Sequence, residues 1–342
     1  MRQDRTNNTV KEWMYAMKKV FALTIALSLL VVLAGSALAD EVPWEQLKGE
    51  EFTFVVGFAA GGSNDLAARV LADKLGQLGI DVTVVNRPGG IGVEAAGWVA
   101  SQPPESNIMF WGVPMTLYFE PATRDVGFTW EDFEPVATLG GATFALAGSK
   151  DAPWDTLEEM LDWAHANPGQ LIVGGQGEMS SMHFAMTLIF DEAGVDYRYV
   201  PFAGGADVQM NLAGGHVDVG HLSLAAAYPL YSAGDLNILA HTSIFVDRVE
   251  MAPDVPNVAE AGFSSARELH VLFLHAPKET SPDVIEPLAA AIDEALKDPS
   301  TVSRLEDMGI LVSYLGPQGT RELGEDAHAD VIPAFVEWYQ NY

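Results

Sequence analysis

Short apolar runs alternate with helix-patterned stretches from about residue 50 onward. Phe52–Val56 has the composition of a buried strand, and Leu66–Leu78 follows it with apolar residues at helical spacing. Ile80–Val85 and Asn107–Trp111 are two further predicted strands. Chains that alternate strands and helices in this way fold around mainly parallel sheets. We therefore expect an α/β fold.

Glycine-rich loops follow the predicted strands in two separate blocks. The first block contains Gly61-Gly62 and Gly89-Gly90, and the second contains Gly174–Gly177 and Gly204-Gly205. Ligands of open α/β sheets bind at the carboxyl ends of the strands. Two blocks of loops therefore predict two lobes that face each other across a cleft.

The N-terminal region has the pattern of a secretory signal peptide. Lys18-Lys19 are followed by the apolar run Val20–Leu33 and by the small-residue cleavage site Ala37-Leu38-Ala39. A membrane anchor is the alternative, but about 14 apolar residues are fewer than the ~20 that a spanning helix needs. Residues 1–16 resemble no signal element, so Met17 is the better expected start. We expect a periplasmic protein.

The chain contains no cysteine. Disulfides, a thiol nucleophile and thiolate metal sites are therefore excluded. The lipid-bearing cysteine of bacterial lipoproteins is absent as well, so we expect a protein that is not lipid-anchored.

The formal net charge is −29. Residues 1–39 carry five basic and two acidic side chains, a net of +3, so their removal leaves −32 on the mature chain. Such a charge repels nucleic acid and anionic lipid, and neither is an expected partner. Because salt screens the mutual repulsion of surface carboxylates, the composition predicts a halophilic or marine source.

The loop "FAAGGSND", Phe58–Asp65, separates the first predicted strand from the first helix. Its glycine pair lets backbone approach a ligand, and Ser63 or Asn64 can cap a helix whose first N–H groups attract an anion. A plain tight turn is the alternative. The lysine of a phosphate-binding loop and the third glycine of a dinucleotide fingerprint are both missing. We therefore expect an anion site without a nucleotide or another cofactor.

A secreted serine hydrolase is the main alternative function. Ser180, Ser181 and His183 lie close together in sequence. However, G-x-S-x-G is absent, and residues two apart on a helix point in different directions. Only long-range assembly could produce a catalytic triad here.

A metal site is a further alternative. His216, Asp218 and His221 form the best cluster, but on a strand His221 would point away from the other two. His270 and His275 flank an apolar run and would lie on opposite strand faces. We expect no metal.

Four motifs, in this order over most of residues 50–300, resemble a known family. They are "GGSNDLAARVLADKLGQLGIDVTVVNRPGGIGVEAA", "HANPGQLIVGGQGEMSSMHFA", "VPFAGGADVQMNLAGGHVDVG" and "DVPNVAEAGF". Together they are similar to the extracytoplasmic solute-binding proteins of tripartite tricarboxylate transporters, which include the Bordetella uptake-gene family. Each motif is unspecific alone, and the ordered set is specific.

The resemblance implies a two-lobed periplasmic-binding-protein fold of type II that closes over its ligand without chemistry. Residues 40–142 and 244–342 would form lobe 1, and residues 143–243 would form lobe 2. The protein would be a monomer that delivers a small organic carboxylate to a large and a small membrane subunit. A periplasmic sensor that presents the ligand to a receptor is an alternative.

The resemblance also implies the ligand contacts, mainly backbone N–H groups, hydroxyls and ordered water. They are Phe58, Gly61, Gly62, Ser63, Asn64, Asp65 and Gly90 in lobe 1, and Ser180, Ser181, His183, Phe202, Gly204, Gly205 and Ala206 in lobe 2. Asp65 would orient the loop or a water, because it repels an anion.

The chain departs from the family pattern at two places. It has Ala59-Ala60 where a proline often precedes the first glycine pair, and His270–Pro277 lacks the usual Trp-Gly. The second departure leaves the contacts to the far end of the ligand open. Without paired arginines in these motifs, a mono- or dicarboxylate is favoured over citrate.

Overall fold

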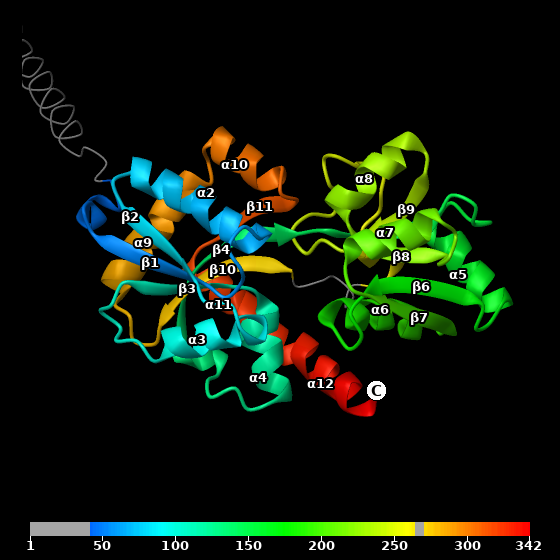
Figure 1. Ribbon diagram of the computed structural model, residues 1–342, viewed down its shortest axis with the longest axis horizontal. Helices are drawn as coiled ribbons and strands as arrows, with labels where there is room; N and C mark the ends of the chain where they lie inside the picture. Colours follow the sequence, from blue (N-terminus) through cyan, green and yellow to red (C-terminus); the bar gives the residue numbers. More distant parts are fainter. Residues whose placement is uncertain (1–41, 264–269) are drawn as a thin grey trace, which may run out of the picture. The chain divides into compact units, whose positions relative to one another are not determined.

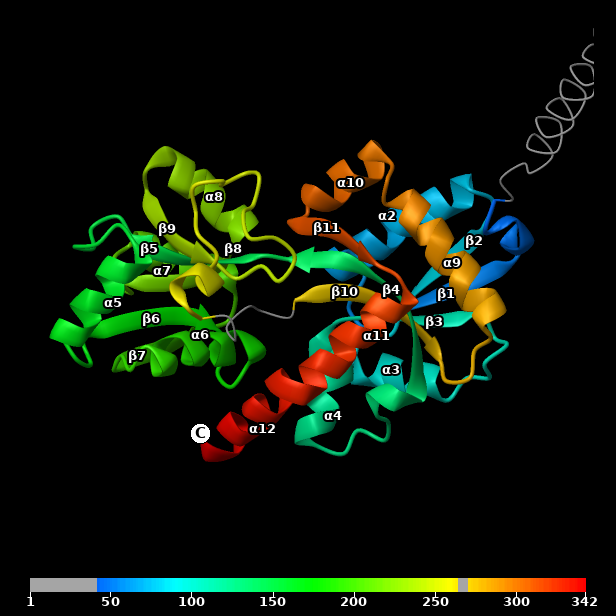
Figure 2. The ribbon, with the colours of Figure 1, turned by 180° about the vertical axis from the view of Figure 1, so that it is seen from behind.

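The computed structural model describes residues 42–263 and 270–342. The predicted signal peptide lies outside the described residues. Residues up to Glu45 and residues Gln46–Tyr342 form two separate units, and everything below concerns the second (Figures 1 and 2). Within the described ranges, no helix is long and apolar enough to cross a membrane.

The first of two sheets, which we call sheet A, has six strands in the described part of the chain. Across the sheet they are β11 (Ile310–Leu315), β4 (Phe133–Ala142), β10 (Val271–Pro277), β3 (Ile108–Gly112), β1 (Glu51–Val56) and β2 (Asp81–Asn86). β1 pairs in parallel with β2 and β3, whereas β10 pairs antiparallel with β3 and β4, and β11 pairs antiparallel with β4.

The second sheet, sheet B, has five described strands. In order they are β7 (Tyr197–Phe202), β6 (Leu171–Gln176), β8 (Val219–Ser223), β5 (Phe144–Ser149) and β9 (Leu236–His241). β6 pairs in parallel with β7 and β8, and β5 pairs antiparallel with β8 and β9.

The α/β prediction is confirmed, but both sheets are mixed where mainly parallel sheets were expected. The chain leaves sheet A along β4, passes through Thr143 and enters sheet B as β5. It returns from β9 to β10, which lies beside β4 in sheet A. Because the outgoing and returning strands run in opposite directions, their pairing is antiparallel.

Helices cover the sheets. The helices connected to strands of sheet A are α2 (Ser63–Gln77), α3 (Val93–Ala100), α4 (Glu120–Thr123), α9 (Pro282–Ala295), α10 (Pro299–Glu306), α11 (Pro317–Asp326) and α12 (Ile332–Asn341). The short helical turns in the same part of the chain are η1 (Glu45–Leu47), η2 (Gly90–Gly92), η3 (Met115–Phe119), η4 (Trp130–Asp132) and η7 (Ala327–Val331). Those of sheet B are α5 (Leu157–Ala166), α6 (Ser181–Glu192), α7 (Gly205–Ala213) and α8 (Leu224–Ala233), with η5 (Val258–Ala261) on the return path.

Two apolar clusters hold these helices on sheet B. Val173 of β6 packs with Met160 of α5 and Met186 of α6 in one cluster. In the other, Leu222 of β8 packs with side chains of α7 and α8. Successive strand side chains point to opposite faces, so each face of sheet B is covered by its own helix pair (Figure 1).

Local residue types explain two helix boundaries. Helix α2 ends before Gly79, whose φ of +91° suits glycine. Helix α5 is capped by Thr156, whose side chain accepts from the N–H of Glu159, although the acidic Asp155 just before it suits an N-cap as well. The helix starts late since Trp154, just before it, is buried in the core of sheet B.

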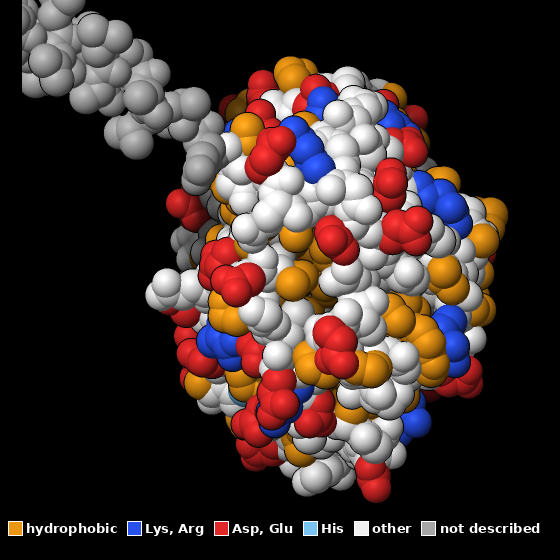
Figure 3. Space-filling model, turned by 90° about the vertical axis from the view of Figure 1, so that its left-hand side faces the viewer, with side chains coloured by type: hydrophobic (Ala, Val, Ile, Leu, Met, Phe, Trp, Pro, Cys, Tyr) orange, Lys and Arg blue, Asp and Glu red, His pale blue; other side chains and the backbone are white. Residues whose placement is uncertain are grey.

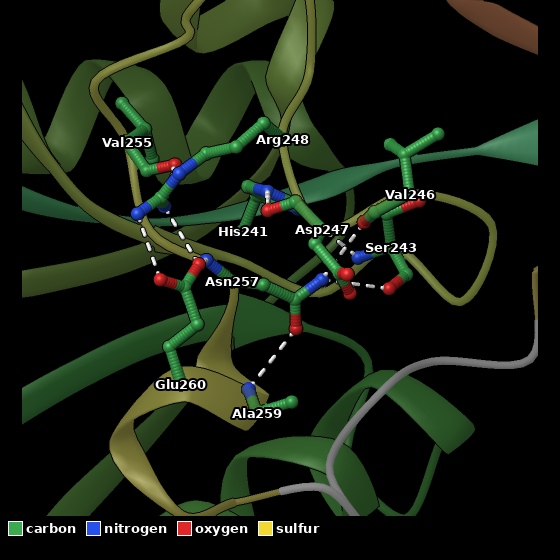
Figure 4. Close-up of polar contacts among 9 residues, drawn as sticks. All are labelled: His241, Ser243, Val246, Asp247, Arg248, Val255, Asn257, Ala259 and Glu260. Carbon is green, nitrogen blue, oxygen red and sulfur yellow. Dashed lines mark hydrogen bonds and ion pairs between the residues drawn. The ribbon is translucent and has the colours of Figure 1, made fainter.

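The motif "DVPNVAEAGF" anchors the segment that leaves sheet B. Asn257 is fully buried, and its Nδ2 donates to the carbonyls of Ser243 (2.9 Å) and Val246 (3.1 Å). Glu260 accepts from the N–H of Asn257 and pairs with Arg248 (Figure 4). This family-like motif is therefore explained by the packing of the segment that leads from β9 back to sheet A, rather than by contact with a ligand.

Acidic side chains are spread over the surface with basic ones among them, as the face in Figure 3 shows. Two ion pairs of this kind join α2 to the region of α10: Lys74 with Asp298 (2.7 Å) and Arg304 with Asp73 (3.1 Å). Basic side chains are thus used in tying elements together.

Candidate functional site

A cavity of about 810 Å³ lies at the carboxyl ends of β1, β3 and β6. Its wall includes Phe144 of sheet B and Val271 and Leu272 of sheet A. Five predicted site residues are also on the wall: Phe58, Ser63, Asn64, Ser180 and Ser181. The cavity therefore joins the two glycine-rich loops that were identified separately in the sequence.

Asp65 holds the first loop, Phe58–Asp65, in place through hydrogen bonds. Its carboxylate accepts from the N–H of Gly61 (2.8 Å), from Nδ2 of Asn86 (3.0 Å) and from Arg69. Although burial opposes it, these hydrogen bonds hold the pKa of Asp65 below its usual value. Asp65 is only 2% exposed and lies off the cavity wall. This geometry fits a residue that orients the loop.

The first turn of α2 opens onto the cavity. Gly62 is the N-cap and supplies no side-chain cap. In the described structure, no hydrogen bond occupies the backbone N–H groups of Ser63 and Asn64. A helix start with open N–H groups carries partial positive charge, so this turn can receive an anion without a basic side chain.

The start of α6 has the same orientation toward the cavity, but it is capped. Ser180 Oγ accepts from the N–H of His183 (3.1 Å) and donates to the carbonyl of Gln176 (2.7 Å). Among the described contacts, none uses the N–H groups of Ser181 and Met182, both of which line the cavity. One helix start thus follows a strand of sheet A, and the other follows a strand of sheet B.

His183 lies behind this second loop. Its ring stacks on Tyr199 at 3.6 Å between centroids, and its Nδ1 accepts from the N–H of Met179 (3.2 Å). Burial lowers the pKa of His183 to about 4. A neutral His183 therefore supports the loop through the Met179 N–H, and it is not part of the wall.

Other predicted residues also lie outside the wall: Gly61, Gly62, Gly90, Phe202, Gly204, Gly205 and Ala206. Phe202 packs in the core cluster on the α7 side of sheet B, and Gly204 is the N-cap of α7. Gly90 is the neighbour of Ile91, which does line the cavity. Ligand contact by these residues stays a prediction.

Two apolar residues on the wall have unusual backbone. Ile91 and Met179 both have φ of +57°, which costs an ordinary residue roughly 1–2 kcal/mol. Thr116 holds the backbone of Ile91 by donating from Oγ1 to the Ile91 carbonyl (2.6 Å). His183 holds the backbone of Met179 by accepting from its N–H. Backbone strain held in place by neighbours is typical of functional sites.

The sequence reasoning missed the contribution of α4 and α12. Glu120 of α4 and Arg124, the C-cap of that helix, line the cavity, and Phe335 and Tyr339 line it from α12. No glycine loop marks either segment. The four-residue spacing of the acidic Glu120 and the basic Arg124 was the one available signal.

The geometry does not support the two alternatives raised by the sequence, a serine hydrolase and a metal site. Ser180 Oγ bonds backbone atoms of Gln176, Gly177 and His183, and in the described structure it has no hydrogen bond to an imidazole ring. Within the described residues no group of three or more His, Asp or Glu side chains could hold a metal. Asp218 instead accepts from the N–H of Ile172 (2.8 Å), which explains it structurally.

Comparisons with known proteins agree on one family. A family model described as the tripartite tricarboxylate transporter family receptor, TctC, matches residues 67–332. A Cupriavidus necator protein, named UPF0065 protein in gbd 5′ region, is 31% identical over 306 residues, which is 87% of this chain and 89% of that protein.

Solved structures agree with this similarity. A ligand-free TctC solute-binding protein from Polaromonas superposes with a TM-score of 0.76 at 27% identity, covering 84% of this chain and 98% of its own. A Rhodopseudomonas palustris protein solved with adipate has a TM-score of 0.65 at 26% identity, with coverages of 84% and 98%. The two helix-flanked sheets are thus the fold of periplasmic binding proteins.

Proposed function

Because the chain belongs to the tripartite tricarboxylate transporter receptor family, we propose that it captures a small organic carboxylate in the periplasm for such a transporter. The family consists of solute-binding receptors for transport, not of enzymes. The relative solved with adipate supports a carboxylate ligand. Delivery would be to the large and small membrane subunits, and the signal-peptide pattern of residues 17–40 supports export.

In this proposal the two sheets with their helices act as lobes. Residues 40–142 and 244–342 form lobe 1 and residues 143–243 form lobe 2, in agreement with the assignment of β4 to sheet A and β5 to sheet B. Each lobe brings donors that a ligand needs together, so binding and closure are one thermodynamic event.

The observation that carries the proposal is the pair of helix starts on one cavity. The open N–H groups at Ser63 and Asn64 of α2 and at Ser181 and Met182 of α6 are all on its wall. Hydrogen bonds from such groups to a carboxylate are charge-assisted and strengthened by the helix dipoles. The ligand's carboxylate would sit between the two turns.

Proline substitutions test this without breaking the helices. Ser63→Pro and Ser181→Pro each delete one N–H at the first helical position, where proline is tolerated. The preceding Gly62 (ψ 165°) and Ser180 (ψ 166°) already have the extended backbone that proline requires. Each variant should bind carboxylates about 10- to 100-fold more weakly in calorimetry, with an unchanged melting temperature.

Ser63→Ala and Ser181→Ala are the matched controls, because they keep the N–H and remove the hydroxyl. Wild-type protein should be stabilised by carboxylates in a thermal-shift screen and not by their methyl esters. Equal binding of acids and esters, or full affinity in both proline variants, would contradict the carboxylate site.

A further inference from the structure

Arg124 is the one lysine or arginine among the described residues that line the cavity. Its Nε donates to Oε2 of Glu120 at 2.6 Å, one helical turn away. The Arg124 side chain is 54% exposed, whereas that of Glu120 is 10% exposed. The pair is therefore anchored at its acidic end and open at its basic end.

This pairing leaves most of the guanidinium free. An arginine has five N–H donors in a planar fork, and the described contacts use the one on Nε. The outer edge lies near the glycine turn before Ile91, since a Cβ on Gly90 would be 3.9 Å from Nη2 of Arg124. That geometry suits a second carboxylate, which binds a guanidinium edge through two parallel hydrogen bonds.

The other polar groups on this part of the wall are already engaged. Thr123 donates its hydroxyl proton to the carbonyl of Glu120 (3.1 Å), and Glu178 accepts from the hydroxyl of Tyr342 (2.9 Å). Arg69 of α2 is not on the wall. Arg124 is thus the one lysine or arginine of the described wall, and its pairing through Nε leaves N–H donors for an anionic ligand.

Apolar side chains make up much of the remaining wall. Met115, Met179, Leu272 and Phe335 are among them, contributed by elements of both sheets. A ligand that reaches from the helix starts to Arg124 would cross this surface. Apolar wall favours a hydrocarbon spacer, because a hydroxylated spacer would lose water without gaining partners.

We propose that Arg124 is a specificity-determining residue that binds the second carboxylate of a dicarboxylate whose two ends are separated by an apolar spacer. The inference rests on the proposed function, which supplies the first carboxylate site at α2 and α6. Glu120 is a positioning residue that fixes the plane of the guanidinium.

The test compares acids of equal chain length, hexanoate with adipate and octanoate with suberate, by calorimetry. Wild-type protein should bind the better dicarboxylate at least about tenfold more tightly than its monocarboxylate partner. Arg124→Gln should lower dicarboxylate affinity to the monocarboxylate level and leave monocarboxylate affinity within about twofold. Added salt should weaken wild-type binding of the dicarboxylate more than that of the monocarboxylate.

Three further variants keep the test independent of folding. Glu120→Gln combined with Arg124→Gln avoids leaving a buried carboxylate unpaired, and it should show the same loss of discrimination. Arg304→Gln removes the same charge from an exposed ion pair on α10, outside the cavity, and should discriminate like wild type. Glu120→Gln alone should reduce the preference for dicarboxylates while sparing monocarboxylates.

Two outcomes would overturn the inference in distinguishable ways. If wild-type protein binds monocarboxylates as well as dicarboxylates, or Arg124→Gln weakens both equally, Arg124 has no role in specificity while the proposed function stands. If neither class binds, the carboxylate site itself is wrong, and the proposed function fails together with the inference.

Discussion

The two loops on the cavity reach similar geometry by different means. The first loop precedes α2, lacks a side-chain cap and is held by the charged network of Asp65, Arg69 and Asn86. The second precedes α6, is capped by Ser180 and is held by the neutral ring of His183. An open helix start can thus be supported by ions or by aromatic packing, and the two supports should fail under different conditions.

Removing the carboxylate of Asp65 should have the largest effect. Asp65→Ala leaves the N–H of Gly61 and the amide of Asn86 without their acceptor, and Arg69 without its ion pair. We expect a loss of about 3 kcal/mol in the free energy of unfolding and a loss of ligand binding. Urea unfolding and calorimetry measure both.

Asp73→Ala is the control. Asp73 lies on the same helix as Asp65, α2, and forms an exposed ion pair with Arg304 of α10. It should cost below about 1 kcal/mol. Equal effects of the two substitutions would mean that the first loop does not depend on its buried network.

Lowering the pH should destabilise the second loop through His183. The pKa of His183 is lowered by burial to about 4 from 6.5, so its contribution to stability is present above pH 6.5 and is lost as the pH falls toward 4. In the folded protein the ring becomes protonated, and unable to accept from the N–H of Met179, only as the pH approaches its pKa of about 4. Urea unfolding should therefore show a falling free energy of unfolding from pH 7.5 to pH 5, whereas calorimetry over the same range should show little change in affinity.

His183→Gln should flatten the pH dependence of stability between pH 7.5 and 5. His275, whose pKa burial lowers to about 3, lies in sheet A off the cavity wall, so His275→Gln should flatten the pH dependence of stability without changing affinity. If His183→Gln keeps the wild-type pH profile of stability, His183 does not support the second loop.

Losing the cap of the second loop should have a smaller effect. Ser180→Ala and Ser281→Ala each remove an N-cap, the first at α6 and the second at α9, and each should cost about 1 kcal/mol of stability. Ser180→Ala should also weaken ligand binding, because the cap orders the turn that carries the free N–H groups. Identical affinities in the two variants would argue against that link.

The contact between the second loop and the C-terminus should matter least. Tyr342→Phe deletes the exposed hydrogen bond to Glu178 and keeps the ring that meets His183 edge-on at 5.2 Å. Stability should change by less than about 0.5 kcal/mol, and affinity by less than about twofold. A tenfold loss of affinity in calorimetry would show that the loop depends on this hydroxyl.

Part of the site was predictable because it is local. Glycine pairs after apolar strands mark the loops before α2 and α6, and the structure places Ser63, Asn64, Ser180 and Ser181 on one cavity. The wall formed by Arg124 and Tyr339 was not predictable in the same way. Arg124 is the C-cap of α4 and Tyr339 belongs to α12; the helical patterns of both segments are ordinary, and only packing brings them to the cavity.

The fold shows the same division. Periodicity predicted β1, β2 and β3 to within one residue at each end, because a strand's apolar pattern is local. It could not predict that β10 pairs antiparallel between β3 and β4, because pairing joins residues far apart in the chain.

The sequence by itself determined the α/β class, the two glycine-rich loops and the resemblance to a family of solute-binding receptors. Only the tertiary structure decided which of the predicted residues share a cavity, that Asp65 and His183 stand behind the loops, and that Arg124 faces the same space. The physical reason is that backbone conformation follows short-range sterics and apolar spacing, whereas a binding wall depends on contacts between segments up to about 280 residues apart, from Phe58 to Tyr339.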